Sequence, residues 1–178
     1  EAFHSNNTAA ITFSGTGSLT ATAGETTAGG YGSNTGIYAT GLVMIAEGTT
    51  VTAIASAASR ESYGFGCNSN LIVNGILTGT GGTSTYKSSY GVAAINITVN
   101  GTANVTATGG SSAEKSYGIY AGNYYGNEGG TTINGGTVTA KGNTSALRMA
   151  PTLDSGVTAG GSVNFDGSGA VSYVAADN

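Results

Sequence analysis

At 178 residues, with 32 glycines and only 8% charged residues, the chain has the size of one domain or of one run of repeats. Its runs rich in Thr, Ala, Val and Ile favour an ordered all-β structure over a disordered one. The net charge of −4, with five scattered Lys and Arg, excludes a nucleic-acid-binding face, which needs clustered positive charge. No apolar run approaches the roughly 18 residues of a membrane span, so no membrane insertion is expected.

The composition also bears on location and cofactors. The chain begins at Glu1 without Met, which favours a processed or excised piece. Its low-charge composition, rich in Thr, Asn, Gly and Ser, is typical of an extracellular protein, secreted or on a cell surface. His4 is the only histidine and Cys67 the only cysteine, so His/Cys metal sites lack ligands, and we expect neither metal nor cofactor.

Three short alternations of apolar and polar residues recur in a fixed order, and such alternation predicts strands. The first residue pattern is an apolar residue, a polar residue and glycine, as in Val99-Asn100-Gly101. Its equivalents begin at Phe13, Ile45 (which fits by position only), Val73, Ile133 and Phe165, at spacings between 26 and 34 residues. The second is typified by Val105–Thr108 and the third by Tyr117–Ala121. A period near 30 residues indicates a repeat architecture.

The fold class predicted is therefore all-β: a right-handed parallel β-helix with three short strands in each coil. Residues 1–178 would form a single domain, with coils starting near residues 11, 43, 71, 97, 131 and 163. The right hand follows from the strong chirality preference of parallel crossovers. A β-sandwich or an antiparallel barrel is the alternative.

Alternation assigns residues to the inner and outer faces of each strand. The apolar residues of the second strands and of the third strands should form inward stacks, with Cys67 as an inert thiol in a column of small residues. The Tyr63, Tyr90 and Tyr117 column shares this parity, so buried rings with hydrogen-bonded hydroxyls are expected. Asn74, Asn100 and Asn134 should form a ladder of stacked amides at one corner, continued by Asp166.

Two neighbouring coils carry long segments between the third strand and the next first strand, where loops on a rigid scaffold commonly hold function. The first contains Gly122–Glu128 and the second Pro151–Ser155. Aromatic faces together with amides and carboxylates are the groups that hold sugars. The candidate glycan-binding residues are accordingly Tyr120, Asn123, Tyr124, Tyr125, Asn127, Glu128 and Asp154. These side chains can equally serve to pack the loops on themselves.

Catalysis is not expected, because nucleophilic chemistry needs a base beside the nucleophile and His4 has no obvious partner. Glu128 and Asp154 could approach one another as a carboxylate pair, but two solvated loop acids explain them more simply. The expected function is adhesion or contact with a polysaccharide or host glycan. One alternative is a spacer or fibre subunit that self-associates end to end through open coil ends. A lesser alternative is ice binding through the outward Thr-x-Thr columns, which begin at Thr20 and Thr22.

Two segments carry a family resemblance, namely Thr132–Ala140 (TINGGTVTA) and Ser116–Ala121 (SYGIYA). They resemble repeats in secreted surface proteins of Gram-positive anaerobes, and they look like the right-handed parallel β-helix carbohydrate-binding proteins of clostridia. The resemblance covers roughly residues 9–150. It implies a surface adhesin or carbohydrate-binding module on a β-helix. The clostridial type is associated with calcium, and this chain lacks the repeated Asp that such a role needs.

Overall fold

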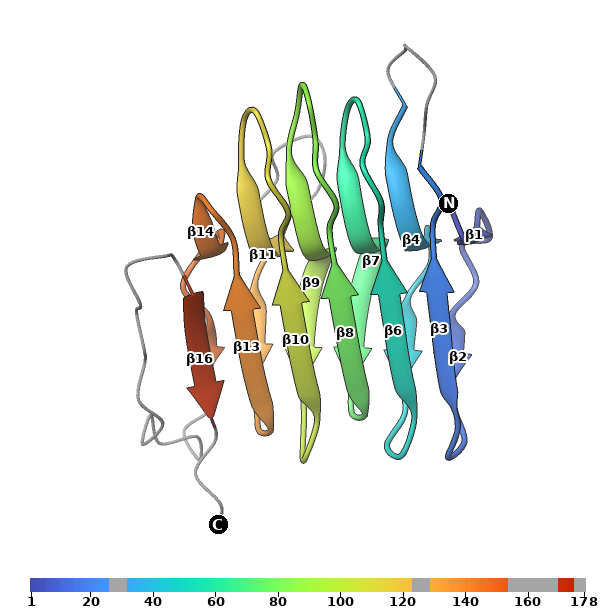
Figure 1. Ribbon diagram of the computed structural model, residues 1–178. Helices are drawn as coiled ribbons and strands as arrows, with labels where there is room; N and C mark the ends of the chain where they lie inside the picture. Colours follow the sequence, from blue (N-terminus) through green and yellow to red (C-terminus); the bar gives the residue numbers. More distant parts are fainter. Residues whose placement is uncertain (26–31, 123–128, 154–169, 175–178) are drawn as a thin grey trace.

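The computed structural model describes residues 1–25, 32–122, 129–153 and 170–174, and Figure 1 draws the rest as a thin grey trace. In the described part of the chain, every regular element is a β-strand. No helix there is long and apolar enough to cross a membrane.

The strands stack in three columns, and in each column a strand pairs in parallel with its equivalents one repeat away. The first-strand column is β2 (Ile11–Phe13), β5 (Val43–Ile45), the ends of β7 (Ser62–Val73) and β9 (Ser89–Val99), β12 (Thr131–Ile133) and β15 (Thr152–Leu153). The second is β3 (Ser18–Thr22), β6 (Thr50–Ile54), β8 (Ile76–Thr80), β10 (Asn104–Thr108) and β13 (Thr137–Lys141). The third is β1 (Phe3–Ser5), β4 (Asn34–Ala39), the starts of β7 and β9, β11 (Ser116–Ala121) and β14 (Ser145–Leu147).

The chain rises through the second strands and returns behind them, advancing from right to left in Figure 1, which makes the coil right-handed. The predicted right-handed parallel β-helix is therefore confirmed, with fewer coils than the six predicted, because the described second-strand column holds five parallel strands. Two of its coils are simpler than predicted, because β7 and β9 each join a third strand to the next first strand without a break. The result is a flattened helix of two layers, a ten-stranded sheet and a six-stranded sheet.

The core lies between these two sheets and consists of the predicted inward stacks. Val105 is fully buried and pairs with Leu77 and Val138, which are also fully buried. Across the core, Phe65 and Val92 pair in the opposite sheet with no exposed surface. Since like residues stack on like in each coil, every coil buries its apolar face against the next, which one coil alone cannot do.

Cys67 lies in the predicted column of small apolar residues. It pairs with Ala39 and Ala94, is buried, and donates through Sγ to the carbonyl of Gly41 at 3.2 Å. Burial raises the pKa of its thiol, so the reactive thiolate is disfavoured. The structure confirms a core thiol at this position.

The asparagine ladder is also confirmed. Asn134 Nδ2 donates to Asn100 Oδ1 at 2.8 Å, and Asn100 Nδ2 donates to Asn74 Oδ1 at 3.0 Å. A second ladder, from Asn96 to Asn70 at 3.0 Å, lies on the outside of the joined strands and was not predicted. Asn100 donates to one neighbouring amide and accepts from the other, so repetition of asparagine along the axis satisfies these polar side chains.

The C-terminal end differs from the prediction. Thr152 and Leu153 pair with Thr132 and Ile133, so the sixth first strand lies here and not at Val163–Phe165. Leu153 packs against the core at the position that Ile133 has one coil earlier, after a connection of only residues 148–151. The prediction of a long insertion that contains Pro151–Ser155 is therefore wrong, and the ladder position given to Asp166 lies outside the described residues.

The last described strand, β16 (Ala170–Val174), also departs from the repeat. It runs antiparallel to β13, at the edge of the second-strand column, as Figure 1 shows. An antiparallel strand does not belong to the parallel coil that was predicted to start near residue 163, so that prediction is wrong. Met149, two residues after the buried Leu147, is 41% exposed. The parallel repeat therefore ends in this region.

Candidate functional site

A column of glycines determines which side chains reach the outside of the third strands. The ideal Cβ of an alanine at Gly91 would lie 2.3 Å from the backbone nitrogen of Thr108, and at Gly64 2.3 Å from that of Thr80. Backbone atoms cannot move aside as the end of a flexible side chain can, so contacts under 3.0 Å are not tolerated. The two sheets therefore approach too closely here for any side chain.

The same glycines break the inside–outside alternation. Tyr63 and Phe65 are two residues apart, so a regular strand would place both in the core. Gly64 faces the opposite sheet and Phe65 follows it into the core, whereas Tyr63 is half-buried and lines a pocket on the outer face. The prediction of an inward tyrosine column is corrected for this reason.

The displaced tyrosines form an aromatic cluster along the axis. The rings of Tyr63 and Tyr90 stack with centroids 4.9 Å apart, and those of Tyr90 and Tyr117 lie 6.3 Å apart at 9°. Tyr120 meets Tyr90 edge-on at 4.9 Å. Burial raises the pKa of Tyr63, and the Glu61 charge raises it further; burial likewise raises the pKa of Tyr90 to about 12. Both hydroxyls therefore stay neutral donors in ordinary buffers.

Beside this cluster, one register position changes from coil to coil. Tyr38 pairs with Gly66, Gly66 with Ala93, and Ala93 with Tyr120. Two coils thus carry an aromatic ring, and the two coils between them carry almost no side chain. Strand spacing of about 4.8 Å places the two tyrosine backbones roughly 14 Å apart across this gap.

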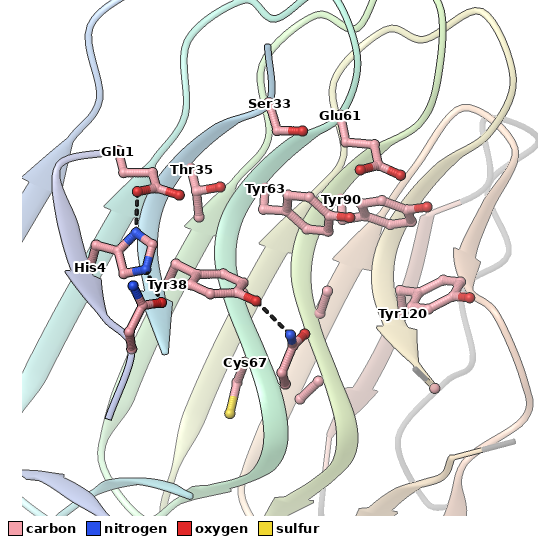
Figure 2. A pocket seen from close by; sticks show the side chains of 16 residues that line it. Glu1, His4, Ser33, Thr35, Tyr38, Glu61, Tyr63, Cys67, Tyr90 and Tyr120 are labelled. Carbon is pink, nitrogen blue, oxygen red and sulfur yellow. Dashed lines mark hydrogen bonds and ion pairs between the residues drawn. The ribbon is translucent and has the colours of Figure 1, made fainter. Parts of the chain in front are cut away.

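The gap is the floor of a pocket of about 560 Å³, which we call the tyrosine slot. Figure 2 shows Tyr38 and Tyr120 at its two sides, with Tyr63 and Tyr90 between them along its upper edge. The ring of Tyr38 lies over Gly66, where an added Cβ would come within 3.2 Å of Cδ2. The slot thus exists because Gly66 and Ala93 leave out the rings that neighbouring coils have.

Polar groups surround the slot. Glu61 lies above Tyr63 and Tyr90, as Figure 2 shows, and Asn68 donates from Nδ2 to the Tyr38 hydroxyl. At the N-terminal side, His4 lies against the Tyr38 ring with centroids 5.2 Å apart. Aromatic surface with a few placed carboxylate and amide groups is the usual make-up of a small-ligand site.

His4 differs from its prediction, because it has partners. Its ring nitrogens hydrogen-bond the carboxylate of Glu1 and the side-chain oxygen of Asn6. These two bonds, with Glu1 contributing first, raise the pKa of the imidazole. His4 lies on β1, one coil before Tyr38 in the same register position.

The predicted site is only partly placed by the structure. Tyr120 lines the slot, and Gly122, which begins the long segment after β11, lines it too. The other six predicted residues lie outside the described residues: Asn123, Tyr124, Tyr125, Asn127, Glu128 and Asp154. The suggested pair of Glu128 and Asp154 lies outside them as well.

The sequence interpretation did not single out Tyr38, Glu61, Asn68 and Ala93 as site residues. An alignment of the repeats could have found them. The informative position is the residue that follows the buried apolar residue of each third strand, such as Ile37 or Ile119. In successive coils that residue is Tyr38, Gly66, Ala93 and Tyr120. When one register position varies within an otherwise regular repeat, packing of the repeat does not by itself require a particular residue type there.

Within the described ranges, no group of three or more His, Cys, Asp or Glu side chains could hold a metal ion. Comparison of the chain with protein-family models, with curated proteins and with solved structures found no match. The slot is therefore interpreted from its own geometry.

Proposed function

We propose that this protein is a non-catalytic extracellular surface module, of adhesin type, that contacts glycans through the tyrosine slot. The observation that carries the proposal is the register column Tyr38–Gly66–Ala93–Tyr120, in which two small residues separate two aromatic ones. This column forms a pocket on a rigid sheet, where side chains are held more firmly than on loops.

A sugar suits this pocket for physical reasons. A pyranose ring has an apolar face of C–H groups and a rim of hydroxyls. Tyr38 and Tyr120 offer aromatic surface to the first, and Glu61 and Asn68 offer polar groups to the second. The volume of about 560 Å³ falls in the range of small-ligand sites and is enough for a short oligosaccharide. Since the rings already pack on one another, little rotamer freedom is lost on binding.

The remaining support comes from the sequence. In the sequence, Gly122, which lines the slot, is followed directly by five of the predicted glycan-binding residues, namely Asn123, Tyr124, Tyr125, Asn127 and Glu128. The resemblance of Ser116–Ala121 and Thr132–Ala140 to repeats of secreted bacterial surface proteins and clostridial carbohydrate-binding β-helices agrees with this function and location.

The test is to fill the slot without disturbing the coil. Ala93→Tyr adds in the third coil the ring that Tyr38 and Tyr120 have in theirs, so the fold should tolerate it. On a glycan array, we expect the unsubstituted chain to bind a defined set of glycans and Ala93→Tyr to lose at least ten-fold in affinity for them. Tyr120→Ala should also weaken binding.

Two matched controls belong to this test. Thr106→Tyr adds the same ring on the outer face of β10, and Tyr86→Ala removes a tyrosine that is 68% exposed away from the slot. Both should bind as the unsubstituted chain does. Absence of any glycan binding by the chain, or binding by Ala93→Tyr at full affinity, would overturn the proposal.

A second candidate function rests on the outer face of the second-strand column. Its threonines lie in register through five strands: Thr20, Thr52, Thr78, Thr106 and Thr139. The neighbouring column is interrupted by Ile54 and Lys141. A regular hydroxyl array about 4.8 Å apart along the axis could order water, which is the basis of ice binding. Thermal hysteresis that is lost in Thr78→Leu and Thr106→Leu would favour this candidate.

End-to-end association remains a proposal of lower weight. A head-to-tail fibre would continue the parallel columns from one copy into the next. The antiparallel strand β16 pairs with β13 at one end of the second-strand column. The edge of β13 is therefore not open to a parallel strand of another copy. Sedimentation over a range of concentrations distinguishes a monomer from a growing fibre.

A further inference from the structure

From the charges and rings around the tyrosine slot, and resting on the glycan-binding function proposed above, we propose that its ligand carries a positive charge. The ligand class is an amino sugar with a free ammonium group, as in glycans built from deacetylated glucosamine.

The charges at the slot are the first argument. Among its described lining residues, the acids are Glu1 and Glu61, and no Lys or Arg is present. Glu61 lies close enough to Tyr63 and Tyr90 for its charge to add to the effect of burial on both hydroxyls. Glu1 lies at the opposite side, near Tyr38. Glu1 is already hydrogen-bonded to His4, so Glu61 is the carboxylate that would attract an ammonium group of the ligand and repel an anionic sugar.

The second argument is independent of these acids and comes from the rings. Arg148 lies with its guanidinium carbon 4.7 Å from the centroid of the Tyr120 ring and donates from Nη1 to the carbonyl of Ala121 at 3.2 Å. Its backbone nitrogen bonds the carbonyl of Ile119, so Arg148 lies one coil beyond Tyr120, away from Ala93. The ring of Tyr120, one wall of the slot, therefore already holds a cation of the protein itself.

Among the described residues, no Lys or Arg lines the side of the slot toward Ala93. Ala93 and Gly66 lie between Tyr38 and Tyr120, and the rings of Tyr63 and Tyr90 border the same space. A ligand ammonium here would lie among several aromatic rings, with a carboxylate beside them. Aromatic rings with an adjacent carboxylate form a recurrent binding arrangement for ammonium groups, because ring quadrupole and charge act in the same direction.

The size of the floor agrees with this ligand class. Beside the Tyr38 ring, which lies over Gly66, the slot has a volume of about 560 Å³, which is more than an ammonium group alone requires. The sugar ring would contact the aromatic side walls, and its amino substituent would face Glu61. Charge-assisted hydrogen bonds of this kind are about twice as strong as neutral ones.

The experiment compares three tetrasaccharides by calorimetry, at a pH where the amine is protonated: glucosamine, N-acetylglucosamine and galacturonic acid oligomers. We expect the glucosamine oligomer to bind at least ten-fold more tightly than its acetylated form, and the galacturonic acid oligomer to bind weakest. Glu61→Gln, which removes charge and keeps shape, should lower glucosamine affinity about ten-fold and leave acetylated binding unchanged.

Glu47→Gln is the control, since it makes the same charge change at a residue that does not line the slot. Equal or tighter binding of the acetylated oligomer, or an unchanged affinity in Glu61→Gln, would overturn the charge preference. If neutral oligomers bind and Ala93→Tyr abolishes that binding, the proposed glycan function stands while this inference fails. If none of the oligomers binds and the glycan array is also negative, both fail.

Discussion

The two outer faces of this protein are built from the same repeat and differ in how strictly they obey it. On the second-strand face, Thr20, Thr52, Thr78 and Thr106 occupy one position in successive coils, and the face is regular. On the third-strand face, Tyr38 and Tyr120 share a register position with Gly66 and Ala93, and a slot results.

This difference separates the positions that stacking between coils explains from the positions that shape the surface. Where each coil repeats its neighbour, a side chain is explained by stacking and by strand propensity. Where a coil departs from its neighbours and still leaves the core intact, the departure shapes the surface. The slot needs only two omitted rings, and the buried stacks beneath it, such as Ile37 and Phe65, are uninterrupted.

The largest expected effect comes from the glycine column that creates the third-strand face. Gly91→Ala would place Cβ 2.3 Å from the Thr108 nitrogen, so the two sheets must separate, at a cost of about 3 kcal/mol in unfolding free energy. Chemical denaturation measures this loss. Gly17→Ala, where nothing lies within 4 Å of the added carbon, should change stability by less than about 0.5 kcal/mol. Equal stabilities of the two variants would contradict the close approach.

A smaller effect should distinguish the two faces directly. Tyr90 contacts Tyr63, Tyr117 and Tyr120, so Tyr90→Ala removes three ring contacts and should cost about 2–3 kcal/mol. Thr106→Ala, on the opposite face, should cost about 0.5 kcal/mol. Thermal unfolding of the two variants provides the comparison. A Thr106→Ala loss as large as that of Tyr90→Ala would show that both faces contribute alike.

The smallest effect concerns alkaline pH. Tyr90 has a pKa raised to about 12, mainly by burial, against about 10 in the unfolded chain. Because the folded state disfavours the phenolate, this contribution to stability is complete below pH 10 and is lost as the pH rises through about 12. Denaturation midpoints at about pH 9 and about pH 11 should therefore differ less in Tyr90→Phe than in the unsubstituted chain. An identical drop in both would contradict the burial of this hydroxyl.

Much of the fold was predictable because the repeat aligns equivalent residues. Leu77, Val105 and Val138 were predicted to stack and they do, and the amides of Asn74, Asn100 and Asn134 bond as expected. The exposed pair of Lys87 and Glu114 also forms, with Nζ and Oε1 2.9 Å apart. These features depend on alternation and on the fixed order of the strands in coils of about 30 residues, and both can be read along the chain.

The candidate site was predictable only in part. Tyr120 was identified from its neighbours in the long segment that follows it, and it does line the slot. Tyr63 and Tyr90 were assigned to the core because alternation was extended through Gly64 and Gly91. At the C-terminal end, the motif at Phe165-Asp166-Gly167 resembled a first strand more closely than Thr152–Leu153, which holds that place.

The sequence by itself determined the parallel β-helix, its period and the residues of its core, because burial in a stacked coil demands the same residue type at the same offset. The tertiary structure alone decided which tyrosines lie outside and what lies between them. The reason is that the close approach of two sheets at Gly64 and Gly91 is a distance between strands that are neighbours only in space. That contact turns Tyr63 and Tyr90 outward, and with Gly66 and Ala93 it makes the slot.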